Sequence, residues 1–183
     1  LNFDGRINGD DQTIIGNALP DFNWGLTNEM SFKDFRFSFL LNGVHGFDVY
    51  NANRRDLEAI TGKTNMSRGV LNYYIPTTYD EQGNIIDPGR TNTDIPAPSG
   101  TEAQYFSDRF VEDGSFIRLS NARLAYNIPS SLTNNILKNA AVYVSGQNLF
   151  ILTKYKGYDP EVSVDGSGEN LTLGIDFSSY PQV

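Results

Sequence analysis

The chain has 183 residues, of which 39% are hydrophobic and 20% charged, so it can bury apolar surface and is not disordered by composition. Its net charge of −8 argues against a nucleic-acid partner, which would select a basic surface, and the absence of cysteine excludes disulfides, thiolate metal sites and cysteine nucleophiles. The aromatic content of 13% and the 17 glycines favour a β protein with many turns.

The first predicted elements are two strands joined by a tight turn. Residues 1–23 are rich in Gly, Asp and Asn, which predicts a loop. Residues 24–32 and 35–44 then alternate apolar and polar side chains, as strands with one apolar face do. Because only Lys33 and Asp34 separate them, the two strands are predicted to form a hairpin. In the first strand the apolar residues are the even-numbered Trp24, Leu26, Met30 and Phe32, interrupted only by Asn28, and in the second they are the odd-numbered Phe35, Phe37, Phe39 and Leu41.

A long segment without strand periodicity follows at residues 45–115. It is rich in Pro, Gly, Asn, Thr and Asp, and a short helix is predicted within residues 48–60. A loop of this length is evidence against an ordinary compact domain.

Two further strands are predicted at 116–127 and 141–152. The apolar parity changes within the first of them, which either a bulge near Ser120 or a strand apolar over half its length would explain. One or two helical turns are predicted at 130–138, and residues 153–180 form another loop with a short strand within 171–177.

The connections between these strands alternate between short and long, which is typical of transmembrane β-barrels. No window holds about eighteen consecutive apolar residues, so no membrane-spanning helix is expected, whereas barrel strands need only about 9–11 residues each. The predicted fold class is therefore all-β, an antiparallel segment of a transmembrane β-barrel with long loops.

Several segments, taken in order, resemble TonB-dependent outer-membrane transporters of the SusC/RagA type. They are TIIGNALPDF at 13–22, SDRFVEDGSFIRL at 107–119, LAYNIP at 124–129, VYVSGQNLF at 142–150, GYDPEV at 157–162 and GIDFSSYPQ at 174–182. Each motif is weak alone, but together they span nearly the whole chain in the family's order.

The resemblance implies that residues 1–183 are the C-terminal part of a large plugged barrel of about 22 strands, without the last strand. It also implies an outer-membrane location in a Gram-negative bacterium of the Bacteroidetes type. The loops at 1–23, 45–115 and 153–180 would be extracellular, and the turns at 33–34 and 130–139 periplasmic. The implied function is uptake of oligosaccharides or oligopeptides with a SusD-like surface lipoprotein, energised by TonB through the plug. No enzymatic activity and no required cofactor are expected.

A candidate calcium loop lies in residues 2–11, which read as most of a D-x-[DN]-x-[DN]-G motif. The five candidate ligands, with Arg6 offering its carbonyl, are Asn2, Asp4, Arg6, Asn8 and Asp11. An Asp/Asn/Gly-rich surface turn explains the same residues equally well, because the first ligand would precede Leu1.

Loop aromatic residues are candidate contacts to a ligand or a partner, because their faces can stack on sugars or grip peptides. They are Tyr73, Tyr74, Tyr79, Tyr105 and Phe106. For any single one of them, packing within the loops is the favoured interpretation.

The remaining candidates favour structural roles. His45 is the only histidine, which argues against a zinc site or a Ser-His-Asp triad and favours a plain polar contact. Glu112 and Asp113 are adjacent and would point to opposite faces of an extended segment, so pairing with Arg109 or Arg118 is expected rather than glycosidase chemistry. Trp24, Tyr126 and Tyr143 are expected near a membrane interface or in barrel packing.

A second candidate function belongs to a different class: a secreted soluble β-sandwich that binds glycan and calcium. The aromatic content, the calcium-like loop and the acidic pI favour it, and the long segment at 45–115 and the ordered motifs oppose it. It requires the alternating apolar residues to be buried between two stacked sheets.

Overall fold

The computed structural model describes residues 9, 12–59, 65–97, 106–133, 136, 139–161 and 175–176. The chain divides into two compact units. The sheet unit comprises Gly16–Val49 and Glu112–Val162, and the loop unit comprises Leu1–Ile15, Tyr50–Val111 and Ser163–Val183. No helix within the described ranges is long and apolar enough to span a membrane.

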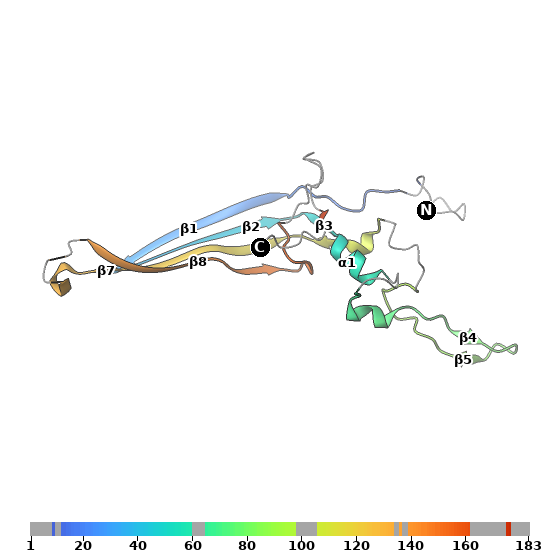
Figure 1. Cartoon of the computed structure of the whole chain (residues 1–183). Helices are drawn as coiled ribbons and strands as arrows, with labels where there is room; N and C mark the ends of the chain where they lie inside the picture. Colours follow the sequence, from blue (N-terminus) through green and yellow to red (C-terminus); the bar gives the residue numbers. More distant parts are fainter. Residues whose placement is uncertain are drawn as a thin grey trace. The chain divides into compact units, whose positions relative to one another are not determined.

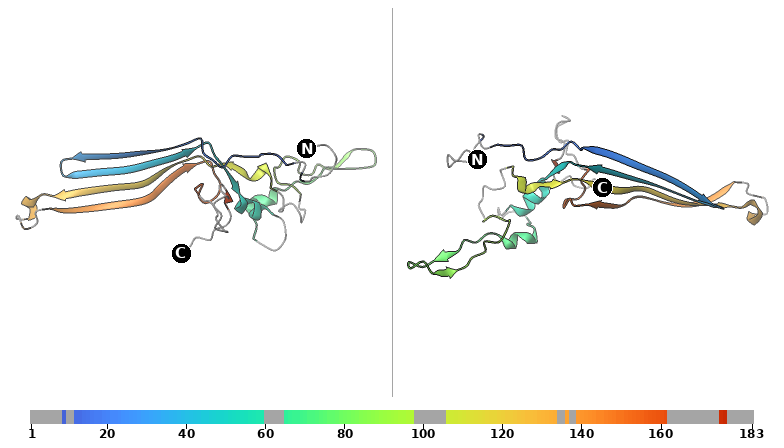
Figure 2. Two further views of the ribbon diagram at one scale, coloured as in Figure 1. Left: turned by 90° about the horizontal axis from the view of Figure 1, so that it is seen from above. Right: turned by 180° about the vertical axis from the view of Figure 1, so that it is seen from behind.

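The sheet unit is built on one antiparallel sheet of four long strands in the order β1-β2-β7-β8 (Figures 1 and 2). The strands are β1 (Phe22–Phe32), β2 (Phe35–His45), β7 (Phe116–Ile128) and β8 (Ala140–Thr153). Each lies within two residues of the segment that the alternation predicts. Lys33, with φ of 51°, starts the tight turn between β1 and β2, and η5 (Ser130–Thr133) lies between β7 and β8.

A β-bulge at Ser120 explains the parity change in β7. Leu41 pairs with Leu119 whereas Leu40 pairs with Asn121, so Ser120 has no partner on β2. The same irregularity faces β8, where Asn148 takes φ of 48°. A bulge shifts side-chain parity by one residue, so both halves of β7 present their apolar side chains to the same face. Of the two explanations that the sequence leaves open, the bulge is confirmed.

The apolar face of this sheet is exposed rather than packed. Phe32 is 71% exposed, Val144 67%, Leu26 49% and Leu124 43%. The soluble β-sandwich requires these side chains to be buried between two sheets, so that alternative fails for the part of the chain that the structure describes.

The loop unit consists of short elements. It contains α1 (Ala52–Glu58), η2 (Arg68–Asn72), β4 (Thr78–Tyr79), β5 (Ile85–Asp87), η4 (Asp108–Phe110) and β9 (Ile175–Asp176). Two more short strands, β3 (Asp48–Asn51) and β6 (Val111–Asp113), cross the boundary between the units, and the second sheet has the order β6-β3-β9. The predicted short helix and short C-terminal strand are thus present, and β4 and β5 form a hairpin that no alternation in the sequence predicts.

A small core holds the loop unit together. Asn51 caps α1 by accepting a hydrogen bond from the Arg54 backbone N–H at 2.8 Å. Tyr50, Ala52 and Phe110 are buried against each other, and the Tyr50 and Phe110 rings meet edge to face at 6.1 Å.

Candidate functional site

The four-stranded sheet has two faces of opposite character, fixed by the strand register. One face is apolar on all four strands, because residues directly opposite in an antiparallel pair share a face. Phe37, for example, lies opposite Met30 on β1 and opposite Leu124 on β7. The polar exceptions on this face within the paired residues of β1 and β2 are Asn28 and His45.

The opposite face is mainly polar and carries the charged side chains of the strands. They are Glu29, Arg36, Arg118 and Arg123, accompanied by Ser38, Asn42, Asn121, Tyr143, Ser145 and Gln147. Leu40, Val44, Phe116 and Ile151 are apolar members of this face.

A polar cavity of about 330 Å³ lies on this second face. The Arg123 guanidinium stacks 4.0 Å from the centroid of the Tyr143 ring, on the neighbouring strand. Arg36 lies 3.4 Å from the Glu29 carboxylate, and both side chains are more than half exposed, so this ion pair contributes little to stability. Together with Ser38 and Asn127 these groups offer hydrogen-bond donors and acceptors to a water-filled space.

Arg118 anchors the segment after β8 to the end of the polar face. It is only 9% exposed, and its Nη2 donates to Asp159 Oδ1 at 2.6 Å and lies 3.1 Å from Glu161 Oε2. Glu112 accepts from the Lys156 backbone N–H at 2.9 Å. Residues 154–161 are thus held by charge-assisted bonds, the strong class of hydrogen bond.

This anchor differs from the sequence expectation. Arg109 and Arg118 were expected to pair with Glu112 or Asp113, but Arg118 pairs with Asp159 and Glu161, and Arg109 forms a short ion pair with Glu58 of α1. Sequence spacing could not reveal these pairs, because 41 residues separate Arg118 from Asp159 and 51 separate Glu58 from Arg109.

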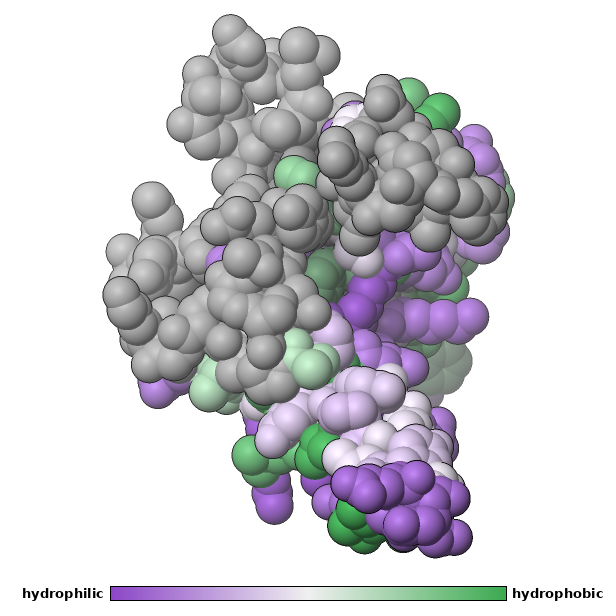
Figure 3. Space-filling model, turned by 90° about the vertical axis from the view of Figure 1, so that its right-hand side faces the viewer, coloured by the Kyte–Doolittle hydropathy of each residue, from purple (hydrophilic) through white to green (hydrophobic). Residues whose placement is uncertain are grey.

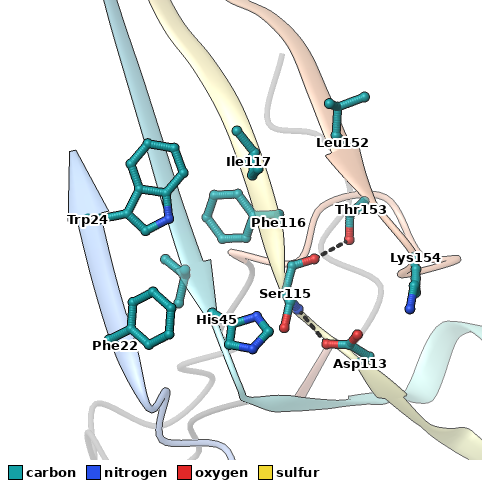
Figure 4. A pocket seen from close by; sticks show the side chains of 11 residues that line it. Phe22, Trp24, His45, Asp113, Ser115, Phe116, Ile117, Leu152, Thr153 and Lys154 are labelled. Atoms are coloured by element: carbon teal, nitrogen blue, oxygen red, sulfur yellow. Dashed lines mark hydrogen bonds between the residues drawn. The ribbon is translucent and has the colours of Figure 1, made fainter. Parts of the chain in front are cut away.

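A second cavity, of about 450 Å³, lies at the end of the sheet where β1 begins at Phe22 (Figure 4). Phe22 and Trp24 of β1 and Leu152 of β8 line its two sides, with Ile117 between them. Trp24 lies flat against Gly43, since a Cβ added there would be 2.6 Å from the indole.

Polar groups line one end of this cavity. His45 packs against the Phe22 ring at 5.2 Å, a ring contact rather than the plain polar contact expected for it. Asp113 accepts from the Ser115 backbone N–H at 2.9 Å, and hydrogen bonds from Ser115 lower the pKa of this carboxyl. Asp113 is therefore an anion beside Lys154.

The predicted calcium ligands Asn2, Asp4, Arg6, Asn8 and Asp11 lie outside the described residues, and so does Tyr105. Within the ranges that are described, no cluster of three or more His, Asp or Glu residues could hold a metal ion. Calcium binding at residues 2–11 stays a prediction.

The loop aromatics divide into packed and open groups. The Arg90 guanidinium lies 5.7 Å from the Tyr73 ring, and Phe106 packs on buried Tyr50 at 4.8 Å, so both have structural contacts. Tyr74 is 38% exposed and Tyr79 59%. Phe106 is 66% exposed in spite of its contact with Tyr50, so Phe106 and Tyr79 are the most exposed of the described candidates, and Tyr79 is more exposed than Tyr74.

Comparison with known proteins shows which proteins this chain is similar to. No family model matches the chain. TonB-dependent receptor P3 of Formosa agariphila is 34% identical over the whole chain, and TonB-dependent receptor SusC of Bacteroides thetaiotaomicron is 30% identical over 99% of it. Over its whole length the chain is homologous to SusC-type TonB-dependent receptors. It spans 17% and 16% of the lengths of these two relatives.

Solved structures of a peptide importer agree with the SusC-type assignment. The structure of the RagAB peptide transporter superposes with a TM-score of 0.67 and 28% identity, covering 85% of this chain and 16% of that one. The RagAB importer in its closed-closed state gives a TM-score of 0.62 and 26% identity, over 86% of this chain and 18% of that one. The predicted fold class and family are therefore confirmed.

Proposed function

We propose that this SusC-type chain forms part of the wall and the outer loops of an outer-membrane nutrient importer. The apolar face of β1, β2, β7 and β8 would contact the hydrocarbon of the membrane, and the polar face would line the lumen. One observation carries this proposal: the apolar face is continuous across four strands and stays exposed. Exposure of such a face to water is unfavourable in free energy, whereas contact with lipid hydrocarbon is not.

The cargo in this proposal is an oligosaccharide or an oligopeptide, taken up without covalent chemistry. Support comes from the relatives, which are named receptors and a peptide importer. A SusD-like surface lipoprotein would cap the outer side, and TonB would supply energy through a plug formed elsewhere in the receptor. The Arg118 anchor and the cavity beside Arg123 would shape the wall that the cargo passes.

The proposal is tested by placing a charge on either face of β8 in the intact receptor. Val144→Lys puts a cation on the apolar face, where the cost in a membrane is about 2–4 kcal/mol near the bilayer midplane, so the amount of folded receptor in the outer membrane should fall. Ser145→Lys, one residue along on the polar face, is the matched control and should assemble normally. Heat-modifiability on gels reports the folded fraction. Equal folded fractions for both variants would contradict a lipid-facing Val144.

A further inference from the structure

The β4–β5 hairpin of the loop unit is a well-formed element that projects its apolar side chains outward. Ile75 and Arg90 exchange backbone hydrogen bonds of 2.9 and 2.8 Å at its base. Its tip is closed by the Asp80 carboxylate, which accepts from the backbone N–H groups of Gln82 and Asn84 at 2.9 and 2.7 Å. An isolated two-stranded hairpin is marginally stable in water, so a covering surface would benefit it.

Three large apolar side chains stand on this hairpin. Tyr79 is 59% exposed, Ile85 62% and Ile86 68%. Tyr79 and Ile85 are directly opposite across the two strands and so share a face. In the lower part of Figure 3, hydrophobic groups stand beside strongly hydrophilic ones. Apolar side chains clustered within a polar rim are typical of protein-binding surfaces, and tyrosine is enriched among the residues that dominate such binding.

The rim of the hairpin is acidic. Residues 78–87 contain the carboxylates Asp80, Glu81 and Asp87 and no Lys or Arg. The nearest cation in the sequence on the C-terminal side, Arg90, donates to the Leu71 carbonyl at 2.5 Å and lies over Tyr73. A surface of this charge favours a partner with basic side chains around an apolar cleft.

We propose that the tip of the β4–β5 hairpin docks into the partner lipoprotein, with the face shared by Tyr79 and Ile85 entering an apolar cleft rimmed by Lys and Arg. This inference rests on the proposed function, since it needs the lipoprotein partner of the importer. The acidic rim would speed the encounter and make the association sensitive to salt, and the apolar side chains would slow dissociation.

The experiment uses the intact receptor in detergent and the purified SusD-like lipoprotein of the same organism. The triple variant Tyr79→Ser, Ile85→Ser and Ile86→Ser should raise the dissociation constant at least about tenfold, as loss of central interface anchors does. Ile136→Ser and Tyr158→Ser are matched controls, because these side chains are 80% and 86% exposed and lie in the sheet unit. Both controls should bind as the wild type does. Heat-modifiability checks that every variant is folded.

The outcomes distinguish failure of the docking proposal from failure of the importer proposal. If the triple variant binds the lipoprotein as tightly as the wild type, the docking proposal is wrong while the importer proposal stands. If the variant keeps that affinity but binds outer-membrane lipid vesicles less, the hairpin contacts a membrane and the docking proposal is overturned. If the wild-type receptor itself does not bind the lipoprotein, the proposed pairing fails. Glu81→Lys should weaken the salt dependence of association, and an unchanged dependence would contradict the acidic rim.

Discussion

The sheet unit and the loop unit reach order by different physical means. In the sheet unit, long strands carry a period of two, and their apolar side chains remain exposed on one face. In the loop unit, order comes from capped turns, charged hydrogen bonds and a core of three buried residues. In the proposed importer the first unit has an apolar environment on one side, whereas the second is expected to depend on a few particular side chains. The contrast teaches that the loop unit is the more sensitive to single substitutions at buried positions.

The largest expected effect in the loop unit comes from its core. Phe110 is 6% exposed, and Phe110→Ala removes a buried ring, which costs about 3–5 kcal/mol. Phe106→Ala is the matched control, because this ring is 66% exposed and should cost much less. Limited proteolysis of the intact receptor between residues 50 and 111 measures the difference. Equal cleavage rates for the two variants would show that the loop unit does not depend on this core.

A smaller effect is expected from the Arg118 anchor of the sheet unit. Asp159→Asn weakens a 2.6 Å charge-assisted hydrogen bond to a buried guanidinium, with an expected cost of about 1–3 kcal/mol. Glu161→Gln should cost less, since its contact is 3.1 Å and its side chain is 51% exposed. Hydrogen exchange of residues 154–161 followed by mass spectrometry should be faster in Asp159→Asn than in Glu161→Gln. The reverse order would mean that Glu161 is the main anchor.

The smallest effect concerns pH at the hairpin tip. Hydrogen bonds from Asn84, first from its side chain and then from its backbone, lower the pKa of Asp80 below its usual value of 3.8. The folded turn therefore favours the carboxylate, so its stabilisation is complete above pH 3.8 and is lost as the pH falls through the lowered pKa. Hydrogen exchange of residues 78–87 should accelerate on acidification relative to an Asp80→Asn control. The prediction fails if both proteins respond alike.

The sequence predicts the sheet unit well because alternation is a local signal. Residues 24–32 and 35–44 already display the apolar face, and even the bulge at Ser120 is marked by the change of parity within β7. The hairpin at Lys33 follows from the short polar break. The family motifs indicate a particular transporter family and the function it implies, and periodicity alone indicates neither.

The sequence predicts the short helix and the C-terminal strand of the loop unit, but it does not predict the long-range ion pairs or the β4–β5 hairpin, for a physical reason. The contacts of Arg118 with Asp159 and of Arg109 with Glu58 join residues that are distant in sequence, and no period in the chain indicates them. The β4–β5 hairpin has strands of two and three residues, too short for alternation to be visible. Tyr79 was singled out only by residue type, whereas Ile85 and Ile86 became candidates from their exposure.

The most direct test of the central claim is a cysteine scan along β7 in the intact receptor in outer membranes. A water-soluble thiol reagent that reaches the lumen should label cysteines placed at Asn121, Arg123 and Ala125 and leave those at Ala122, Leu124 and Tyr126 unlabelled. On the N-terminal side of the bulge, the unlabelled positions should be the odd-numbered Ile117 and Leu119 instead of even-numbered ones. Labelling of both parities to the same extent, or a pattern without the shift at Ser120, would contradict a wall with one face in lipid and the other in water.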